Sequence, residues 1–403
     1  MSGPCPPRAG PAPPESAGQA VEGSYTFPRG LVLTSRRGPG NASVDLLDGG
    51  AEAYPRMLSA IARARQSVRL EVYAFSPSGV GDRFIEALES AAARGVAVYV
   101  VIDGWGSAVG GNAVANALRR AGCTVRIHNR LLSLLVGRFG RNHRKILLVD
   151  DEVAFVGGIN IGDENLAGGA QVGWADIALE IRGPQCARLG RMMRRERQPP
   201  DPVSPRIFLS GLGGGWRLRR RYMEAFLKSK ARIHVAHGYF LPDPGVVRAL
   251  KSAARRGVQV HLLLAGQSDL PFVRSATRSL YRQLMAAGVL IHEWEGSILH
   301  AKLAAFDGSL LIAGSFNLDP LSLANLEVLV EVDDPDVVAE GEAWIEDHFL
   351  RSRAMTSMET SSFWHRWVSI PLGRLVSRVA EAIGHLIASR KLRQASRGRR
   401  RPW

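Results

Sequence analysis

The chain has 403 residues, of which 46% are hydrophobic and 22% charged, a balance typical of a folded globular protein and not of a disordered or fibrous one. No run of about 18 or more apolar residues occurs and no charged-then-apolar leader is present, so we expect neither a membrane-spanning helix nor export by a standard signal. Three irregularly spaced cysteines (Cys5, Cys123 and Cys186) indicate neither a disulfide framework nor a zinc site, which favours a reducing cytoplasmic setting.

The net charge of +15 and a pI near 10.5 predict attraction to a polyanion. Nucleic acid and anionic lipid both fit that description, and so does the simpler alternative of a generally basic, soluble surface. The charge alone does not distinguish them.

Residues 1–40 are rich in proline, glycine, alanine and serine and are expected to form a disordered tail. From residue 41 the chain alternates between strand and helix patterns: residues 68–75 and 97–103 are predicted strands, and helices are predicted around Phe84 and Leu88 and over 113–121. This alternation predicts an α/β layered domain over residues 41–190, with a mostly parallel central sheet flanked by helices.

The same pattern then repeats. Residues 232–240 are a predicted strand, residues 246–256 a predicted helix, and 257–260 restart a strand as 95–98 do in the first half. Arginine and proline cluster in residues 191–205, which we expect to link the halves. The sequence thus predicts a second, duplicated domain over residues 206–352 and a basic segment over 353–403.

One motif occurs once in each half. His143, Lys145 and Asp150 have the spacing His-x-Lys-x4-Asp, and His300, Lys302 and Asp307 have it again. In both halves an asparagine follows 17 residues after the histidine, and these residues are Asn160 and Asn317. Two such matches with the same downstream asparagine are not expected by chance.

The motif residues suit phosphate chemistry. The apolar residues after each histidine predict a strand, on which positions i and i+2 share a face, so histidine and lysine should project together. Lysine and asparagine can bind non-bridging phosphate oxygens, and imidazole can attack phosphorus or move protons. Asp150 and Asp307 stand at an odd offset, so we expect them mainly to tie the strand end to the adjacent turn.

Each histidine also requires an acid that orients its ring. Asp176 and Glu327 occur at comparable distances beyond His143 and His300, respectively, and each begins an apolar strand that could pair beside the motif strand. Either acid could instead be an ordinary solvated residue at a strand end. Their matched positions favour the orienting role.

With this motif pair the chain resembles the phospholipase D superfamily. Residues from about 44 to 350 resemble bacterial cardiolipin synthases, in particular the short type without transmembrane helices. The resemblance is also carried by the sequences Tyr239-Phe240-Leu241-Pro242, Gly157-Gly158-Ile159-Asn160 and Trp174-x-Asp176. It implies two phospholipase D-like domains that are related by a pseudo-twofold axis and share one active site.

The resemblance further implies a two-step mechanism that uses no metal and no cofactor. His143 would attack phosphorus to form a phosphatidyl-histidine, and His300 would protonate the departing alcohol and deprotonate the incoming one. Lys145, Lys302 and the two asparagines would hold the phosphoryl oxygens. An acceptor that is the glycerol head of a second lipid would yield cardiolipin, whereas water would yield phosphatidic acid.

Two segments favour a lipid partner over nucleic acid. Residues 131–136 are apolar with basic neighbours and precede the first motif, although they could equally form a buried turn. From residue 372 apolar positions follow helical spacing, with tryptophans before them and arginines after them, as in helices that lie on anionic membranes. A helix docked on the protein is the alternative for this segment.

We therefore expect a peripheral enzyme at the cytoplasmic face of a bacterial membrane. Its expected substrates are phosphatidylglycerol and, in addition, phosphatidylethanolamine, while nucleic acid is disfavoured. A phospholipase D-type hydrolase or a nuclease of the same superfamily is the alternative, and a catalytically dead scaffold is disfavoured because every motif position is intact. The sequence leaves the oligomeric state open.

Overall fold

The computed structural model describes residues 42–77, 79–129, 140–166, 173–196, 198–199 and 202–356. The proline-rich tail, the apolar segment 131–136 and the C-terminal helix predicted from the sequence lie outside these residues. Within the described part of the chain, no helix combines the length and apolar character needed to cross a bilayer.

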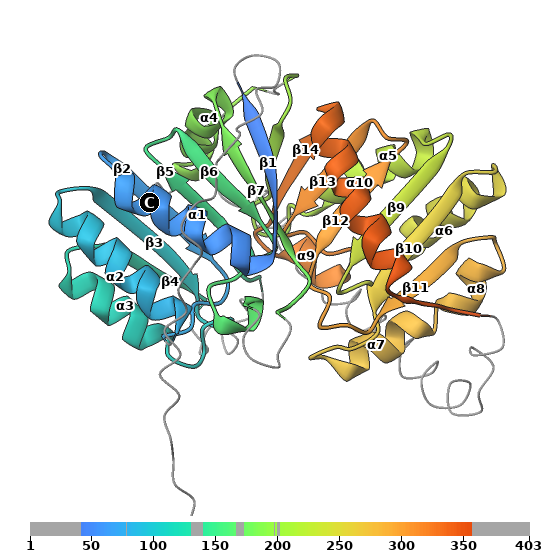
Figure 1. Cartoon of the computed structure of the whole chain (residues 1–403), viewed down its shortest axis with the longest axis horizontal. Helices are drawn as coiled ribbons and strands as arrows, with labels where there is room; N and C mark the ends of the chain where they lie inside the picture. The colour runs from blue at the N-terminus through green and yellow to red at the C-terminus, as the bar shows by residue number, and fades with distance from the viewer. Residues whose placement is uncertain are drawn as a thin grey trace, which may run out of the picture. The chain divides into compact units, whose positions relative to one another are not determined.

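In the described residues, the first half forms one sheet of seven strands, in the order β1-β7-β6-β5-β2-β3-β4 (Figure 1). Strands β2, β3 and β4 are parallel, and all other neighbours are antiparallel. The strands are β1 (Ser43–Asp48), β2 (Ser67–Val72), β3 (Ala97–Asp103), β4 (Thr124–His128), β5 (Ile146–Val149), β6 (Val153–Gly157) and β7 (Ile177–Arg182).

The second half forms a sheet whose order is β15-β11-β10-β9-β12-β13-β14-β8. Apart from β15, it matches the first sheet strand for strand, with β9-β10-β11 parallel in place of β2-β3-β4. The strands are β8 (Arg206–Leu209), β9 (Arg232–His237), β10 (Gln259–Ala265), β11 (Leu290–Trp294), β12 (Lys302–Phe306), β13 (Leu310–Gly314), β14 (Val328–Val332) and β15 (Arg353–Ala354). The duplicated, layered α/β fold predicted from the sequence is confirmed.

The expectation of mostly parallel sheets is wrong, because both sheets are mixed. The motif strand β5 turns into β6 within three residues, and β12 turns into β13 equally fast. So short a connection can join only antiparallel strands, since a parallel pair requires a long crossover. The residues of these turns include Asp150 and Asp307, which both have φ +53°. Strand β15 also shows that the second sheet extends into the segment assigned to the basic tail.

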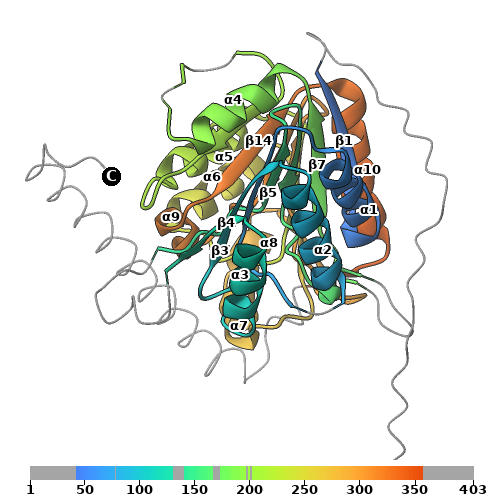
Figure 2. The ribbon, with the colours of Figure 1, turned by 90° about the vertical axis from the view of Figure 1, so that its left-hand side faces the viewer.

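The helices form because their apolar residues recur on one face. In α1 the buried side chains Ala53, Met57 and Ala60 follow this spacing, and Pro55 inside the helix removes one of its backbone hydrogen bonds. Figure 2 shows α1, α2 and α3 side by side over the first sheet. The helices are α1 (Gly49–Arg63), α2 (Val80–Ala93), α3 (Gly111–Arg120), α4 (Pro184–Met193), α5 (Trp216–Lys228), α6 (Pro244–Arg255), α7 (Pro271–Arg278), α8 (Tyr281–Met285), α9 (Pro320–Ala324) and α10 (Pro335–Leu350).

One hydrophobic cluster joins the two halves. It contains Leu148 of β5 and Val156 of β6 together with Ala313 of β13 and Val330 of β14, and it continues onto α10. A second cluster fills the other face of the second sheet, against α5, α6 and α8. Both faces of β12 are therefore buried, which explains why the residues after His300 are continuously apolar.

Candidate active site

The motif histidines and lysines lie where the motif strands begin. His143 and Lys145 precede β5, His300 precedes β12, and Lys302 is the first residue of β12. All four side chains are buried. Lys145 Nζ donates a hydrogen bond to the backbone carbonyl of His143 at 2.8 Å, and Lys302 Nζ makes the same bond to His300. The same local geometry thus occurs twice.

The two halves are joined at these positions by backbone bridges. Asn142 pairs with Leu326, and Ala175 pairs with Leu299, in both cases parallel. The backbone N–H of His143 donates to Leu326 O at 2.9 Å, and that of His300 donates to Ala175 O at 2.8 Å. Each histidine segment is therefore held beside the segment that leads to the acid of the other half, which brings all four motif side chains into one site.

The orienting acids cross between the halves. His143 Nδ1 lies 3.1 Å from Glu327 Oε2, and His300 Nδ1 lies 2.6 Å from Asp176 Oδ2. The sequence placed each acid next to the motif strand of its own half, which is wrong. The strands β7 and β14, which these acids precede, are separated from β5 and β12 by β6 and β13. The acids reach the site only because the bridges above align each of them with the opposite histidine.

These contacts fix the tautomer of both rings. His143 Nδ1 also faces the carbonyl oxygen of Ser315 at 3.1 Å, and both of its neighbours are acceptors, so Nδ1 carries the hydrogen. His300 Nδ1 in the same way donates to Asp176. In the neutral rings, Nε2 is left with a lone pair, the form needed to attack phosphorus or accept a proton.

Burial determines the charge of the histidines. It lowers the pKa of His143 to about 4, with Glu327 opposing and Lys145 adding to the shift. Burial and then the charge of Lys302 lower the pKa of His300 to about 3, against the effect of Asp176. At neutral pH and without substrate, both rings are neutral bases.

Burial affects the pKa of both lysines, and the charge of Lys302 also affects that of Lys145. Burial and the charge of Lys302 lower the pKa of Lys145 to about 7. Burial also lowers the pKa of Lys302 to about 8, although Asp176 and Glu327 work to raise it. Two buried cations in one site, one of which lowers the pKa of the other, favour the binding of an anion, and a phosphodiester supplies one.

The two acids remain ionised. Burial acts to raise the pKa of Asp176, but the charge and hydrogen bond of His300 hold it below its usual value. His143 has the same effect on Glu327, whose Oε2 also accepts the Ser315 hydroxyl at 2.5 Å. Each acid can therefore stabilise an imidazolium ion that forms during proton transfer.

The asparagines are buried on the loops after β6 and β13. Asn160 Oδ1 accepts the backbone N–H of Ala74 at 3.2 Å, which orients its amide. Asn317 Oδ1 has no hydrogen-bond partner among the described residues. Their assignment as ligands of phosphoryl oxygens stays a prediction.

The motif aspartates lie at the opposite ends of the motif strands from the lysines. Asp150 accepts the backbone N–H groups of Arg65, Gln66 and Ser67, which lead into β2. Asp307 accepts the three corresponding N–H groups at the start of β9. Both carboxylates thus connect the turn after a motif strand to the beginning of the adjacent strand.

The comparisons with known proteins agree with this site. Residues 57–187 and 222–349 match the protein family described as cardiolipin synthase, PLD-like domain. This chain belongs to that family. It is thus a phospholipid phosphatidyltransferase, and the resemblance to the phospholipase D superfamily found in the sequence is confirmed.

Individual relatives and structures give the same result. Cardiolipin synthase B of Salmonella typhi is 34% identical over 321 residues, which are 72% of this chain and 76% of that protein. Cardiolipin synthase 1 of Staphylococcus aureus is 28% identical over 367 residues, 85% of this chain and 74% of that protein. The crystal structure of phosphatidylserine synthase from Haemophilus influenzae shares the fold, with a TM-score of 0.67 at 13% identity over 86% of this chain and 95% of that one.

Several polar residues of this phosphatidyltransferase site were given no role in it from the sequence, although Tyr239 belongs to one of the segments that carry the family resemblance. The ring of Tyr73 lies edge-on to His143 at 5.0 Å between centroids, and Tyr239 lies in the same way beside His300 at 5.7 Å. Arg141 donates to the Tyr73 hydroxyl at 3.1 Å. One available signal was that a tyrosine follows both β2 and β9 within two residues.

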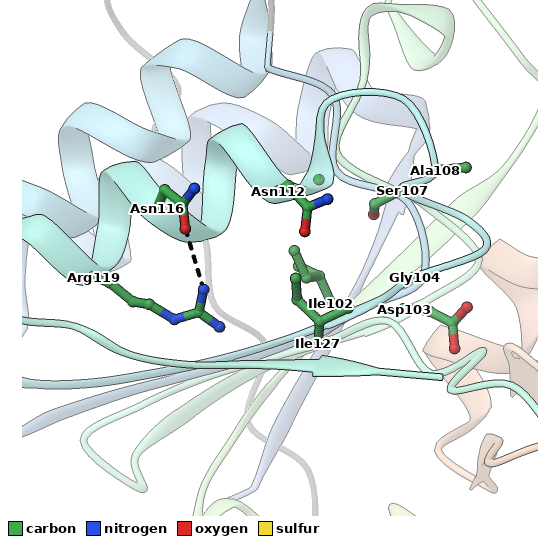
Figure 3. Close-up of a pocket in the computed structure, with 10 residues that line it drawn as sticks. Ile102, Asp103, Gly104, Ser107, Ala108, Asn112, Asn116, Arg119 and Ile127 are labelled. Atoms are coloured by element: carbon green, nitrogen blue, oxygen red, sulfur yellow. Dashed lines mark hydrogen bonds between the residues drawn. The ribbon is translucent and has the colours of Figure 1, made fainter. Parts of the chain in front are cut away.

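A cavity of about 380 Å³ lies next to the first motif, at the ends of β3 and β4 and the start of α3 (Figure 3). Asp103 lines it and also accepts the backbone N–H of Asn142 at 2.7 Å. The motif histidines and lysines are not among its lining residues. Within the described part of the chain, no three His, Cys, Asp or Glu side chains are grouped so that they could hold a metal ion.

Proposed function

We propose that this chain is a cardiolipin synthase that transfers a phosphatidyl group from one phospholipid to the glycerol head group of another through a phosphohistidine. The observation that carries the proposal is the crossed arrangement in which His143 faces Glu327 and His300 faces Asp176, with two buried lysines between the halves. Phosphatidylglycerol is the proposed substrate, and phosphatidylethanolamine the proposed additional donor.

In the first step, Nε2 of His143 attacks phosphorus and the bond to the head-group oxygen breaks. His300 gives its Nε2 proton to the departing alkoxide, so that a neutral alcohol leaves. This step requires a protonated His300, whose pKa is low in the empty site partly because of Lys302. The negative phosphodiester offsets the lysine charges when it binds and thereby raises the pKa of His300.

In the second step, the acceptor alcohol replaces the departed one. His300 removes its proton, the alkoxide attacks phosphorus, and the P–N bond to His143 breaks. Lys145, Lys302, Asn160 and Asn317 hold the non-bridging oxygens, whose negative charge must be stabilised throughout both steps. Both histidines return to their starting states.

We also propose that the enzyme binds the cytoplasmic face of an anionic bacterial membrane as a peripheral protein. The net charge of +15 supports this, because basic surfaces bind anionic lipid headgroups. Pelleting with vesicles that contain phosphatidylglycerol, but not with purely zwitterionic vesicles, is the expected result. Equal pelleting with both would contradict the proposal.

The function is tested by incubating the purified protein with phosphatidylglycerol vesicles, with and without phosphatidylethanolamine, and separating the lipids by thin-layer chromatography. We expect cardiolipin to form. Plasmid DNA is incubated in parallel, and a double variant with His143→Ala and His300→Ala controls for contaminating activity. Phosphatidic acid as the main product would indicate a hydrolase, and nicked DNA with unchanged lipid would indicate a nuclease.

A further inference from the structure

Two tyrosines flank the histidines and differ in their hydroxyl partners. Tyr73 and Tyr239 both lie edge-on to a catalytic histidine, and a motif lysine lies over each ring, at 5.1 Å for Lys145 and 5.7 Å for Lys302. The Tyr73 hydroxyl is bound by the guanidinium of Arg141, whereas the Tyr239 hydroxyl is bound by a carboxylate, that of Asp269. The groups that bind the two tyrosine hydroxyls therefore carry opposite charges.

The hydrogen-bonding capacities of the two sides are also opposite. Tyr73 accepts from Arg141, so its own O–H hydrogen remains available to an acceptor. Tyr239 donates its hydrogen to Asp269, 2.7 Å from each carboxylate oxygen, so that its oxygen presents only lone pairs. Burial raises the pKa of Tyr239 and Asp269 raises it further, so the hydroxyl keeps its proton. On the side of His300, the Tyr239 oxygen and the Asp269 carboxylate therefore offer only hydrogen-bond acceptors.

Asp269 is placed to contact a ligand. It is exposed, and an ionised carboxylate has more acceptor positions than one tyrosine hydroxyl occupies. Its charge also acts on the pKa of Lys302 and of Tyr73, so it lies within electrostatic reach of the phosphate-binding lysine and of the opposite tyrosine. One tyrosine side chain separates it from the His300 ring.

The stereochemistry of phosphoryl transfer determines which part of the substrate meets this side. The attacking and leaving atoms lie roughly in line through phosphorus. With His143 as the nucleophile, the departing alcohol, and later the acceptor alcohol, therefore lies on the side of His300. This assignment rests on the proposed function.

We propose that Asp269, presented by Tyr239, is a specificity-determining residue that selects alcohols carrying a second hydrogen-bond donor close to the reacting hydroxyl. Glycerol and the glycerol head group have such a hydroxyl. While the first hydroxyl is bound at His300, the second donates to the Asp269 carboxylate. A monohydric alcohol of the same length leaves the carboxylate without this bond.

The test measures the choice between two acceptors in one reaction. The enzyme acts on phosphatidylglycerol vesicles in equal concentrations of deuterated glycerol and 1-propanol, and mass spectrometry gives the ratio of deuterated phosphatidylglycerol to phosphatidylpropanol. We expect wild type to favour glycerol and Asp269→Ala to lower the ratio about tenfold or more, as for the loss of a hydrogen bond to a charged group. Asp269→Asn, which keeps one acceptor oxygen, should lie between them.

The matched control is Asp336→Ala, which removes an exposed carboxylate on α10 and should leave the ratio unchanged. Because a ratio does not depend on the amount of active enzyme, a partly unfolded variant does not distort it. An equal ratio in wild type and Asp269→Ala would overturn the inference while leaving the proposed function intact. A wild-type enzyme that transfers no phosphatidyl group would overturn both.

Discussion

His143 in the first half and His300 in the second have the same immediate neighbours but different surroundings. The backbone carbonyl of each histidine accepts a hydrogen bond from the lysine of the same motif, and each ring lies edge-on to a tyrosine. Nδ1 of each histidine also contacts a carboxylate of the opposite half. The histidine, lysine, tyrosine and carboxylate of the site therefore occur in the same arrangement in both halves. The differences begin with the partners of those groups.

The first difference is the environment of the acids. Glu327 shares Oε2 between His143 and the Ser315 hydroxyl, and His143 has the Ser315 carbonyl as a second acceptor. At the position of Ser315 the first half has Gly158, where any Cβ would collide with the Asp176 carboxylate. Among the described residues, Nδ1 of His300 hydrogen-bonds Asp176 alone, at the shorter distance of 2.6 Å.

The second difference is the residues beside the histidines. In the first motif, Asn142 and Arg144 both hydrogen-bond Glu71 Oε2 at 3.2 Å, which holds the strand start in a polar network. In the second motif the corresponding residues are Leu299 and Ala301, which pack in the hydrophobic cluster. A rigid polar setting suits a nucleophile, and a single close carboxylate suits a group that gains and loses a proton, which supports unequal roles for the histidines.

The largest expected effect separates these roles directly. His143→Ala and His300→Ala should each lower cardiolipin formation by roughly 10⁴-fold, since each removes a group that the chemistry requires. They should differ with a phosphatidyl ester of p-nitrophenol, whose leaving group needs no proton. His300→Ala should then accumulate phosphatidyl-enzyme, because no base activates the acceptor, and His143→Ala should form none. Protein-bound radioactive phosphorus measures the intermediate.

Labelled protein in His143→Ala together with none in His300→Ala would reverse the assignment of nucleophile and acid–base. Label in neither variant, with normal labelling of wild type, would contradict a simple division of roles. A His348→Ala variant, which alters a buried histidine stacked on Trp344 away from the motifs, serves as the control for nonspecific damage.

Replacing the orienting acids should affect the two histidines unequally. In Asp176→Asn, the amide can donate to His300 Nδ1 and stabilise the wrong tautomer, so we expect a loss in kcat of roughly 10³- to 10⁴-fold. In Glu327→Gln, the Ser315 carbonyl still accepts from His143 Nδ1 and preserves the tautomer. The expected loss is therefore smaller, on the order of 10- to 100-fold.

Steady-state kinetics on vesicles measures both losses, and thermal unfolding of the variants shows whether each remains folded. The second acceptor of His143 is the backbone carbonyl of Ser315, so no side-chain substitution at Ser315 can remove it. Equal losses in the two single variants would show that the second acceptor of His143 has no catalytic effect.

The sequence predicted what the two halves have in common. The motif residues, the asparagines and the acids were found by comparing the repeats, and the strand predicted over 97–103 coincides with β3 (Ala97–Asp103). Local hydrophobic patterns determine such elements, because a buried strand or an amphipathic helix must present apolar residues to the core. For the same reason, the packing of helices on sheets followed from the sequence.

The exchange of acids between the halves was not predictable from spacing. It depends on two short backbone bridges, at Asn142 and at Ala175, that link residues far apart in the chain. The mixed sheets were missed because hydrophobic patterns do not reveal strand direction. The contacts of Arg141 with Tyr73 and of Asp269 with Tyr239 were missed for a further reason. A repeat comparison detects only positions that match, whereas Arg141 and Asp269 make the halves different.

The pH dependence should distinguish the two lysines. The lowered pKa of Lys145, about 7, means that its charge is lost as the pH rises through 7, and Lys302 follows at about 8. The fraction of free enzyme with a protonated His300 already decreases with pH in this range, so we expect kcat/KM for free enzyme and lipid to fall more steeply above pH 7, by about a further tenfold for each pH unit at first. Lys145→Arg keeps its charge and should move this limb toward pH 8, whereas Lys302→Arg should leave it near 7.

The measurement is kcat/KM as a function of pH with phosphatidylglycerol in detergent micelles. The arginine variants are expected to be slower throughout, because a guanidinium does not reproduce the geometry of an ammonium group. The comparison therefore uses only the pH at which kcat/KM begins its steeper fall above pH 7, not the absolute rates. A limb that stays at the same pH in both variants would rule out the lysines as its origin.

The smallest effect concerns the motif aspartates, which should stabilise the fold without taking part in catalysis. Asp150 stands five residues beyond Lys145, roughly 16 Å along an extended strand, and binds three backbone N–H groups. Asp150→Asn and Asp307→Asn suit the positive φ at these positions but place an N–H₂ group among donors. Each should lower the free energy of unfolding by about 1–2 kcal/mol and change kcat less than about twofold.

The pH dependence of the free energy of unfolding provides the control for this prediction. The hydrogen bonds of Arg65, Gln66 and Ser67 outweigh burial and lower the pKa of Asp150, and the pKa of Asp307 is lowered in the same way. The stabilisation is therefore complete above the usual carboxyl pKa of about 4 and is lost as the pH falls through the native value. In urea unfolding, wild type and the asparagine variants should differ at pH 7, and the difference should shrink as the pH falls below about 4. A large loss of kcat in a stable Asp307→Asn variant would instead assign this aspartate to the chemistry of the second half.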